Sequence, residues 1–308
     1  MNVFYFNECL PSQFNGSLQT VFETIIREFN RLTRDKNLKI EKAIITHKIP
    51  SEILVCNTNL KKLIDSCNDK ELKKIALSYF IKYPIDYYYQ IDDIFTDEDL
   101  AIKYEFNELD ATNLIIAHKM SWFLLSLPLC NLLKQDLIIV KSGTQQTQIH
   151  NWYGNNNSYI THHIAESIGS REKNITNLQY CFGNKDCVMS DTFISDYLAS
   201  PISAQELIID KFIDAINAHL LFPAKHDDNL VKTCKGIGNE ATYELRSKAL
   251  GGIRVYFSCN ETCIYIGGMG TKATSVGKEQ TADICRASNE ISKIKATNPA
   301  TKNKTQST

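Results

Sequence analysis

The sequence lacks the features that mark several large classes of protein. It has almost no net charge, since 34 Lys and Arg residues stand against 35 Asp and Glu residues, so the whole chain shows no basic excess of the kind that attracts nucleic acid or membranes. The longest apolar run, Met120 to Leu133, is too short to span a bilayer. The first residues lack the basic region, apolar core and cleavage site of a secretory signal. We therefore expect a cytoplasmic protein with no membrane partner.

The cysteines and histidines form no convincing framework. Ten cysteines are spread from Cys9 to Cys285 without the dense, regular spacing of a small disulfide-rich domain, and we interpret them as reduced thiols. His162, His163 and Glu166 place a histidine and a carboxylate four residues apart, but no third ligand is evident. Structural histidines are the favoured interpretation, and we predict neither a metal nor a cofactor.

Periodicity in the first 200 residues indicates mixed α and β structure. Apolar residues from position 18 to 32 recur at helical spacing, and Ser17 stands before them as a candidate N-cap. A polar stretch rich in Asn, Gln and Gly, residues 143–157, is typical of a loop. The other predicted elements are a strand over residues 38–46, helices over 69–82 and 110–126, and a buried strand over 135–141.

A new segment begins near Pro201. Ser203 can cap a helix that runs to Leu220, and Glu206 follows it in capping-box register. We predict an α+β protein with three parts: a mixed α/β N-terminal regulatory, sensor or targeting domain over residues 1–200, a small module over 201–295, and a disordered tail over 296–308. The last 108 residues carry a formal charge of +3, and the first 200 carry -4.

Three short alternating runs, TYELRS, IRVYFS and TCIYIG, predict a meander of antiparallel strands between Glu240 and Gly268. Period-two alternation sends one set of side chains toward the helix from Ser203: Tyr243, Leu245, Ile253, Val255, Phe257, Ile264 and Ile266. The opposite, open face is predicted to carry Glu244, Arg246, Arg254, Tyr256, Cys263 and Tyr265. Guanidinium groups can clamp phosphates while aromatic rings stack on bases, so this face is a candidate RNA platform.

The segment after the third strand adds basic residues. Gly267, Gly268 and Gly270 are expected to let the chain turn sharply and deliver Lys272 to the edge of the platform, before a final helix that runs to Ile294. The predicted RNA-binding residues are Tyr256, Tyr265, Lys248 and Lys278.

The string YELRSKALGGIRVYF, followed by IYIGGMGTKATSVGKEQTADICRA, resembles the RelE/HigB superfamily of toxin mRNA interferases over about ninety residues. The resemblance implies a small antiparallel sheet packed with helices, preceded by a first strand. It also implies a metal-independent cleavage of mRNA in the ribosomal A site, with the 2′-hydroxyl as nucleophile. Carried over residue by residue, the catalytic set is Glu244, Arg246, Arg254 and Lys272.

The family pattern is incomplete in one respect. Many relatives place a Tyr or His in or beside the final helix, and this chain has neither after Tyr265. Glu244 remains a candidate base, and Tyr265 or Tyr256 a candidate acid. The simpler alternatives are that both tyrosines pack beneath a helix and that the arginines lie on an ordinary solvent-exposed sheet face.

Two hypotheses from different classes follow. The first is a toxin-like RNA endonuclease in a bacterial toxin–antitoxin or anti-phage setting, with RNA and an antitoxin or defence-complex protein as partners. The alternative is a non-catalytic RNA- or protein-binding module with the same fold. A third, a nuclease that depends on a metal in the N-terminal domain, predicts that chelation stops activity.

Overall fold

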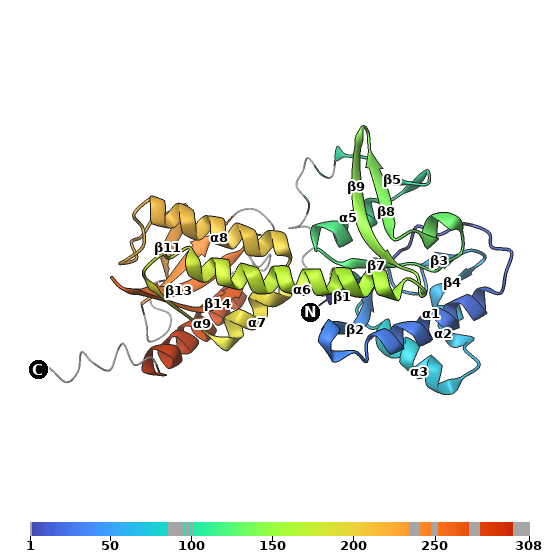
Figure 1. Cartoon of the computed structure of the whole chain (residues 1–308), viewed down its shortest axis with the longest axis horizontal. Helices are drawn as coiled ribbons and strands as arrows, with labels where there is room; N and C mark the ends of the chain where they lie inside the picture. The colour runs from blue at the N-terminus through green and yellow to red at the C-terminus, as the bar shows by residue number, and fades with distance from the viewer. Residues whose placement is uncertain are drawn as a thin grey trace, which may run out of the picture. The chain divides into compact units, whose positions relative to one another are not determined.

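The computed structural model of the chain describes residues 2–85, 95, 99, 101–234, 241–247, 252–270 and 278–297 (Figure 1). The chain divides into two compact units, unit 1 from Met1 to Ile168 and unit 2 from Gly169 to Thr308. Both units combine helices with a sheet of mixed strand direction, so the predicted α+β class is confirmed. Within the described ranges, no helix combines the length and the apolar character needed to cross a membrane.

Unit 1 is built on a seven-stranded sheet in the order β2-β1-β7-β9-β8-β5-β6. β2, β1, β7 and β9 run parallel, and β8, β5 and β6 extend the sheet with antiparallel pairs. Its strands are β1 (Asn2–Phe6), β2 (Ile40–Ile45), β5 (Glu105–Phe106), β6 (Leu109–Asp110), β7 (Phe123–Leu125), β8 (Leu137–Ser142) and β9 (Gln145–Trp152), beside a small hairpin of β3 (Leu54–Val55) and β4 (Thr58–Asn59). Its helices are α1 (Leu18–Leu32), η1 (Lys36–Leu38), α2 (Leu60–Asp65), α3 (Lys70–Tyr79), α5 (Thr112–Lys119) and η4 (Asn131–Lys134).

Aromatic side chains fill the core of unit 1. The β1 residue Phe4 meets Phe29 of α1 edge-on, with ring centroids 5.2 Å apart. Phe6, two residues further along the same face of β1, lies 5.8 Å from Phe80, which follows α3. Tyr5, between them, points to the other face and stacks on Trp122. Side chains therefore cover β1 on both faces, which explains its continuous apolar sequence.

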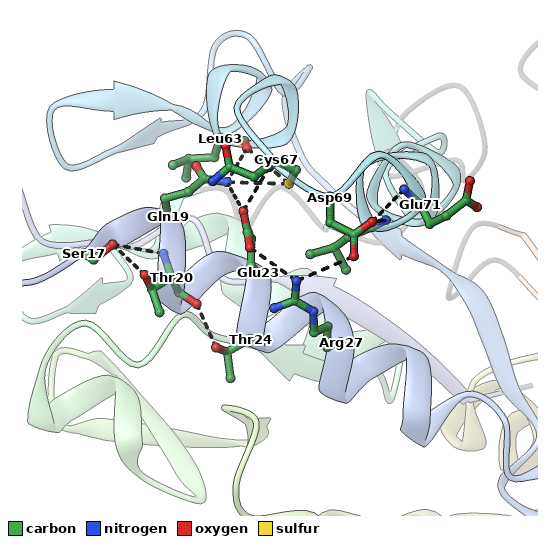
Figure 2. A network of polar contacts seen from close by, with 12 residues as sticks. Ser17, Gln19, Thr20, Glu23, Thr24, Arg27, Leu63, Cys67, Asp69 and Glu71 are labelled. Carbon is green, nitrogen blue, oxygen red and sulfur yellow. Dashed lines mark hydrogen bonds and ion pairs between the residues drawn. The ribbon is translucent and has the colours of Figure 1, made fainter.

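A polar network on the outer side of α1 joins it to the segment between α2 and α3 (Figure 2). Ser17 caps α1 by accepting from the backbone N–H of Thr20. Arg27 lies 3.5 Å from Glu23 and 3.8 Å from Asp69, the N-cap of α3. These ion pairs are partly exposed and contribute little stability individually, so their effect is to set the position of α3 beside α1.

Buried amides and hydroxyls join the carboxyl ends of the parallel strands. Asn7, directly after β1, donates to Ser126 Oγ at 2.9 Å, and Ser126 Oγ donates to Asn151 Oδ1 at 2.7 Å. The backbone N–H of Cys9 donates to Asn7 Oδ1 at 3.0 Å. All four residues are buried, so this chain of hydrogen bonds holds the segment after β1 in one conformation.

Unit 2 contains a five-stranded sheet in the order β10-β14-β13-β12-β11, in which β10 is parallel to β14 and every other pair is antiparallel. Its strands are β10 (Asp186–Met189), β11 (Val231–Cys234), β12 (Thr242–Arg246), β13 (Arg254–Cys259) and β14 (Cys263–Gly270). Its helices are α7 (Asp191–Ala199), α8 (Ile202–Asn217) and α9 (Lys278–Thr297), and α6 (Asn157–Tyr180) contains the division between the two units.

Helices cover both faces of the unit 2 sheet. The face predicted to meet the helix after Pro201 packs against α8, where Phe212 lies 5.8 Å from Phe257 between ring centroids. α9 lies on the opposite face, where Ile284 and Ile291 are buried against the strands (Figure 1). The packing of α9 on this second face was not predicted, and it changes the interpretation of the candidate RNA platform.

The predicted elements agree with the structure where periodicity was long and clear. α1 with its Ser17 cap, β2, α3, β8, α8, α9 and the meander β12-β13-β14 all occur in the predicted regions. α8 begins at Ile202 with Pro201 at the N-cap position, so Ser203 lies inside the first turn rather than capping it. Residues 298–308 of the predicted disordered tail lie outside the described residues, while residues 296 and 297 belong to α9.

Two predictions in unit 1 were wrong. The helix predicted over residues 110–126 ends at Lys119, because Ser121 turns the chain with a φ of 53° and the buried strand β7 follows. The predicted loop over 143–157 contains the strand β9, which pairs with β8 from Gln145 to His150. Most of the first half of β9 is exposed and needs no apolar residues. The polar sequence of this strand therefore lacks the apolar alternation from which a strand is predicted.

The division between units also differs from the predicted boundary near Ala199 to Ser203. Unit 2 begins at Gly169 and includes the end of α6, β10 and α7, because Leu178, Phe193 and Tyr197 belong to its core. The C-terminal unit is therefore about thirty residues longer than the proline and the helix cap near residue 201 indicated.

Candidate functional site

The predicted site residues Glu244 and Arg246 lie on β12, and Arg254 lies opposite Arg246 on β13. Glu244 is paired across the strands with Tyr256 in the same register. Side chains that face one another in an antiparallel pair share a face of the sheet, so the four residues form one group on the side covered by α9. We call Glu244, Arg246 and Arg254, together with Gln280 of α9, which donates a hydrogen bond to Glu244, the Glu244 cluster.

Glu244 is the centre of the cluster. Arg246 Nε donates to Glu244 Oε1 at 2.6 Å, and Arg254 Nη1 donates to the same oxygen at 2.5 Å. Gln280 Nε2, in the first turn of α9, donates to Glu244 Oε2 at 2.9 Å. The Glu244 side chain is 1% exposed, so this carboxylate is a buried counter-ion held by three donors.

The arginines keep hydrogen-bonding capacity beyond Glu244. Their side chains are 27% exposed for Arg246 and 13% for Arg254. Each guanidinium carries five N–H donors, and within the described ranges each places one of them on a side chain, that of Glu244. Two guanidinium groups against one carboxylate leave a local excess of one positive charge, which suits a bound anion such as a phosphate.

Lys232 on β11 adds a further cation that the sequence analysis missed. It lies directly opposite Glu244 in the antiparallel ladder, so it shares the face of the Glu244 cluster. Its side chain is exposed, and it forms no ion pair within the described part of the chain. The short strand β11 was not recognised from the sequence, because four residues are too few to show periodicity.

The predicted stacking tyrosines are not exposed. Tyr256 is 0% exposed and packs with Ile284 and Ala287 of α9, while Tyr265 is 1% exposed and packs with Ile291. Cys263, predicted on the same open face, is buried as well. The open aromatic platform is therefore wrong: α9 supplies an apolar stripe that covers the rings.

The glycines of β14 explain why α9 fits so closely. A Cβ on Gly267 would lie 2.3 Å from the backbone oxygen of Ala287, and one on Gly268 would lie 3.3 Å from the Ala287 Cβ. Both glycines belong to the strand and sit where its register shifts opposite Tyr256. They were predicted to form a sharp turn, but they serve a close approach of helix to sheet.

The Tyr256 hydroxyl has unusual surroundings. Its oxygen is buried, and it has no hydrogen-bond partner in the described part of the chain. Burial, and next the nearby Glu244 charge, raise the pKa of Tyr256 well above its usual value, so the phenol keeps its proton at neutral pH. Asp283 of α9 raises this pKa further, and the Arg254 charge opposes the shift.

The side chains of three other predicted residues are not described. Lys248 and Lys272 lie outside the described residues. Lys278 is the first residue of α9, and its side chain is not described. The structure therefore brings together Glu244, Arg246 and Arg254 from the predicted catalytic set.

The histidines near the start of α6 were the one metal candidate. Glu166 lies 2.7 Å from His163 Nδ1 and 3.3 Å from His162 Nε2. His163 also lies close to His150, with ring centroids 4.2 Å apart. Within the residues that the structure describes, no group of three or more metal-binding side chains has a geometry suited to an ion.

Three comparisons found no match: no protein-family model, no curated protein and no solved structure matches the chain.

Proposed function

We propose that unit 2 binds the RNA backbone at the Glu244 cluster and acts as a toxin-like, metal-independent RNA endonuclease of the RelE/HigB type. The observation that carries this proposal is the convergence of Arg246 and Arg254, from adjacent strands, on one carboxylate. A phosphorane formed during cleavage needs preorganised cationic donors, and guanidinium groups meet that need without a metal.

The order of elements in unit 2 supports the proposal. The resemblance implies a first strand before the helices, and β10 precedes α7 and α8 in this way. The meander β12-β13-β14 and the final helix α9 then follow in the implied order, with β11 as an additional edge strand.

The RNA supplies both the nucleophile and the leaving group of the proposed reaction. The 2′-oxygen loses a proton and attacks the adjacent phosphorus, the bond from phosphorus to the 5′-oxygen breaks, and a proton reaches that 5′-oxygen. The products are a 2′,3′-cyclic phosphate and a 5′-hydroxyl, so no water or cofactor takes part. Glu244 is the proposed proton acceptor, once a substrate phosphate replaces the carboxylate as the partner of the arginines, and the same carboxyl then passes that proton to the 5′-oxygen.

The burial of Glu244 favours the second candidate function. A carboxylate that is 1% exposed and held by three side-chain donors resembles a structural counter-ion more than a general base. With both tyrosines also buried, the cluster has the composition of a phosphate-binding site without a proton donor. Under this alternative, unit 2 docks on RNA or on a protein and cleaves nothing.

Cleavage of a 5′-labelled mRNA by the purified full chain, with and without ribosomes, separates the two functions. The nuclease predicts fragments that end in a cyclic phosphate, which still form with EDTA in the reactions without ribosomes, and loss of these fragments with Arg254→Ala. Lys293→Ala is the matched control, since it removes an exposed cation on the same unit that pairs with Glu290.

The remaining outcomes are equally informative. RNA binding that weakens with Arg254→Ala but yields no fragments supports the docking function. Cleavage of ribosome-free RNA that stops with EDTA contradicts the proposed mechanism, and so does cleavage that is unchanged in Arg254→Ala.

A further inference from the structure

A cleft in unit 1 lies outside the carboxyl ends of two parallel strands. It has a volume of about 820 Å³, and its lining includes Glu8 and Cys9, which follow β1, and His47 and Lys48, which follow β2. Open sheets with parallel strands bind ligands at this edge, and small-molecule sites commonly measure about 300–1,000 Å³. Both its position and its size therefore suit a small ligand.

Glu8 provides the most informative polar group in the cleft. The backbone N–H groups of His47 and Lys48 donate to Glu8 Oε1 at 2.6 and 3.4 Å. Its second oxygen, Oε2, makes no hydrogen bond within the described ranges. Burial raises the pKa of Glu8 to about 7, so near neutral pH the carboxyl can carry a proton. It can then donate to a ligand as well as accept.

Asn113 of α5 supplies a complementary group. Its Oδ1 lies 3.8 Å from the thiol of Cys9, and its Nδ2 donor has no partner in the described part of the chain. Burial raises the pKa of Cys9 to about 12, which leaves the thiol protonated and unsuited to nucleophilic attack. The cleft therefore offers hydrogen bonds rather than a reactive group.

Part of the cleft lining is apolar. Leu54 on β3 and Leu109 on β6 are among the most exposed large apolar residues of the described chain, at 72% and 40%. Ile53 and Ile116 lie buried in the same lining, and Phe95 completes it. Exposed leucines at the rim of a cleft favour a ligand with an apolar, flat body.

The charges in the cleft disfavour an anionic ligand. Glu52 and Asp110 line it, and hydrogen bonds from the backbone N–H and hydroxyl of Thr112 lower the pKa of Asp110, which stays ionised. Lys48 offsets only one of these two negative charges. A polyphosphate would therefore meet repulsion, whereas an uncharged heterocycle would not.

We propose that this cleft binds a nucleoside or free nucleobase, with the ring against Leu54 and Leu109 and its hydrogen-bonding edge at Glu8 and Asn113. A nucleobase edge presents adjacent donors and acceptors, which a protonated carboxyl and a carboxamide satisfy together. The proposal is independent of the function proposed for unit 2.

The test is calorimetric titration of the full chain with the four common ribonucleosides, their free bases, their monophosphates and ATP. At least one nucleoside or base binds below 1 mM, its monophosphate binds more weakly, and ATP binds weakest. Failure of every nucleoside and base at 1 mM, or tighter binding of ATP, overturns the proposal.

The role of Glu8 is tested by pH. Between pH 6 and pH 8, affinity falls about tenfold as Glu8 loses its proton, since its pKa is about 7. Other titratable or charged groups in the lining are Cys9, His47, Lys48, Glu52 and Asp110. Glu8→Gln removes the dependence and keeps binding, because an amide still donates and accepts. Unchanged pH dependence in Glu8→Gln contradicts the assignment.

The apolar wall is tested by a matched pair of variants. Leu54→Asp weakens binding at least tenfold and leaves the fold intact, because the Leu54 side chain is 72% exposed. Leu132→Asp, at another exposed leucine of unit 1, leaves binding unchanged. Equal effects of the two variants overturn the placement of the ring.

Discussion

The two units each contain a glutamate withdrawn from solvent, and the two glutamates differ in their hydrogen-bond partners. In unit 2, two guanidinium groups and one carboxamide hold Glu244. In unit 1, Glu8 receives only two backbone N–H groups, and burial raises its pKa to about 7. The comparison teaches that the partners of a buried carboxyl decide its role: two cationic side chains make Glu244 their counter-ion, whereas Glu8 has backbone partners and a pKa raised by burial.

This difference has consequences for function. A carboxylate neutralised by two cations organises those cations for an incoming anion, so unit 2 suits a phosphate. A carboxyl that titrates near neutral pH can exchange hydrogen bonds with an uncharged molecule, so unit 1 suits a heterocycle. The predictions below break or sharpen this comparison, and they begin with the largest expected effect.

Arg254→Ala is expected to lower the free energy of unfolding of unit 2 by about 3 kcal/mol, because it leaves Glu244 buried with one cation fewer. Both tryptophans, Trp122 and Trp152, belong to unit 1, so fluorescence reports unit 1 and circular dichroism reports both units. Urea unfolding should show an early loss of ellipticity without a change in fluorescence. Lys293→Ala should move neither signal, and equal stability of the two variants would contradict the counter-ion role.

Gly267→Ala is expected to destabilise unit 2 by about 2 kcal/mol, since its Cβ would lie 2.3 Å from a backbone oxygen of α9. Gly268→Ala is the control, because its Cβ would meet the Ala287 side chain at 3.3 Å, where a small shift suffices. Urea midpoints of the two variants measure the difference. Similar midpoints would mean that α9 is not closely packed on β14, which would reopen the face that holds Tyr256.

Glu8→Gln is expected to change the pH dependence of unit 1. The folded-state pKa of about 7 lies above the usual value of 4.5, so the stabilising effect of the proton is complete below pH 4.5 and is lost as pH rises through 7. Between pH 5 and pH 8, the wild type should lose about 2 kcal/mol relative to Glu8→Gln. Tryptophan fluorescence in urea at each pH measures this loss, and parallel curves would show that Glu8 does not titrate in this range.

Long apolar periods were sufficient to predict α1, α8 and the meander of unit 2, because one buried face determines their spacing. The two-residue alternation of the strands did not show what covers the second face of the meander. Tyr256 and Tyr265 alternate in the same way whether solvent or α9 lies above them, and the decisive residues were Gly267 and Gly268, whose small size permits the contact.

The candidate site was predictable only in part for a related reason. Glu244, Arg246 and Arg254 lie on adjacent strands of a recognisable meander, so their proximity followed from strand register. Gln280 joins the cluster from the first turn of a distant helix, and Lys232 lies opposite Glu244 on a strand of only four residues, so tertiary structure places both. The cleft at Glu8 was missed because β1, only five residues long, gave no clear sign of a sheet edge.

Lys232→Ala has the smallest expected effect and addresses the unit 2 half of the comparison most directly. Lys232 is exposed on an edge strand, so its removal should leave the urea midpoint unchanged. If the cations around Glu244 bind phosphate, RNA affinity should fall about fivefold and the slope of log affinity against log salt should decrease by about 0.7, the value for one contact to a single strand. Fluorescence anisotropy of a labelled RNA over a range of KCl concentrations measures both, with Lys293→Ala as the lysine control. An unchanged slope in Lys232→Ala, beside a reduced slope in Arg246→Ala, would confine the phosphate site to the arginines; unchanged slopes in both would leave Glu244 as a purely structural counter-ion.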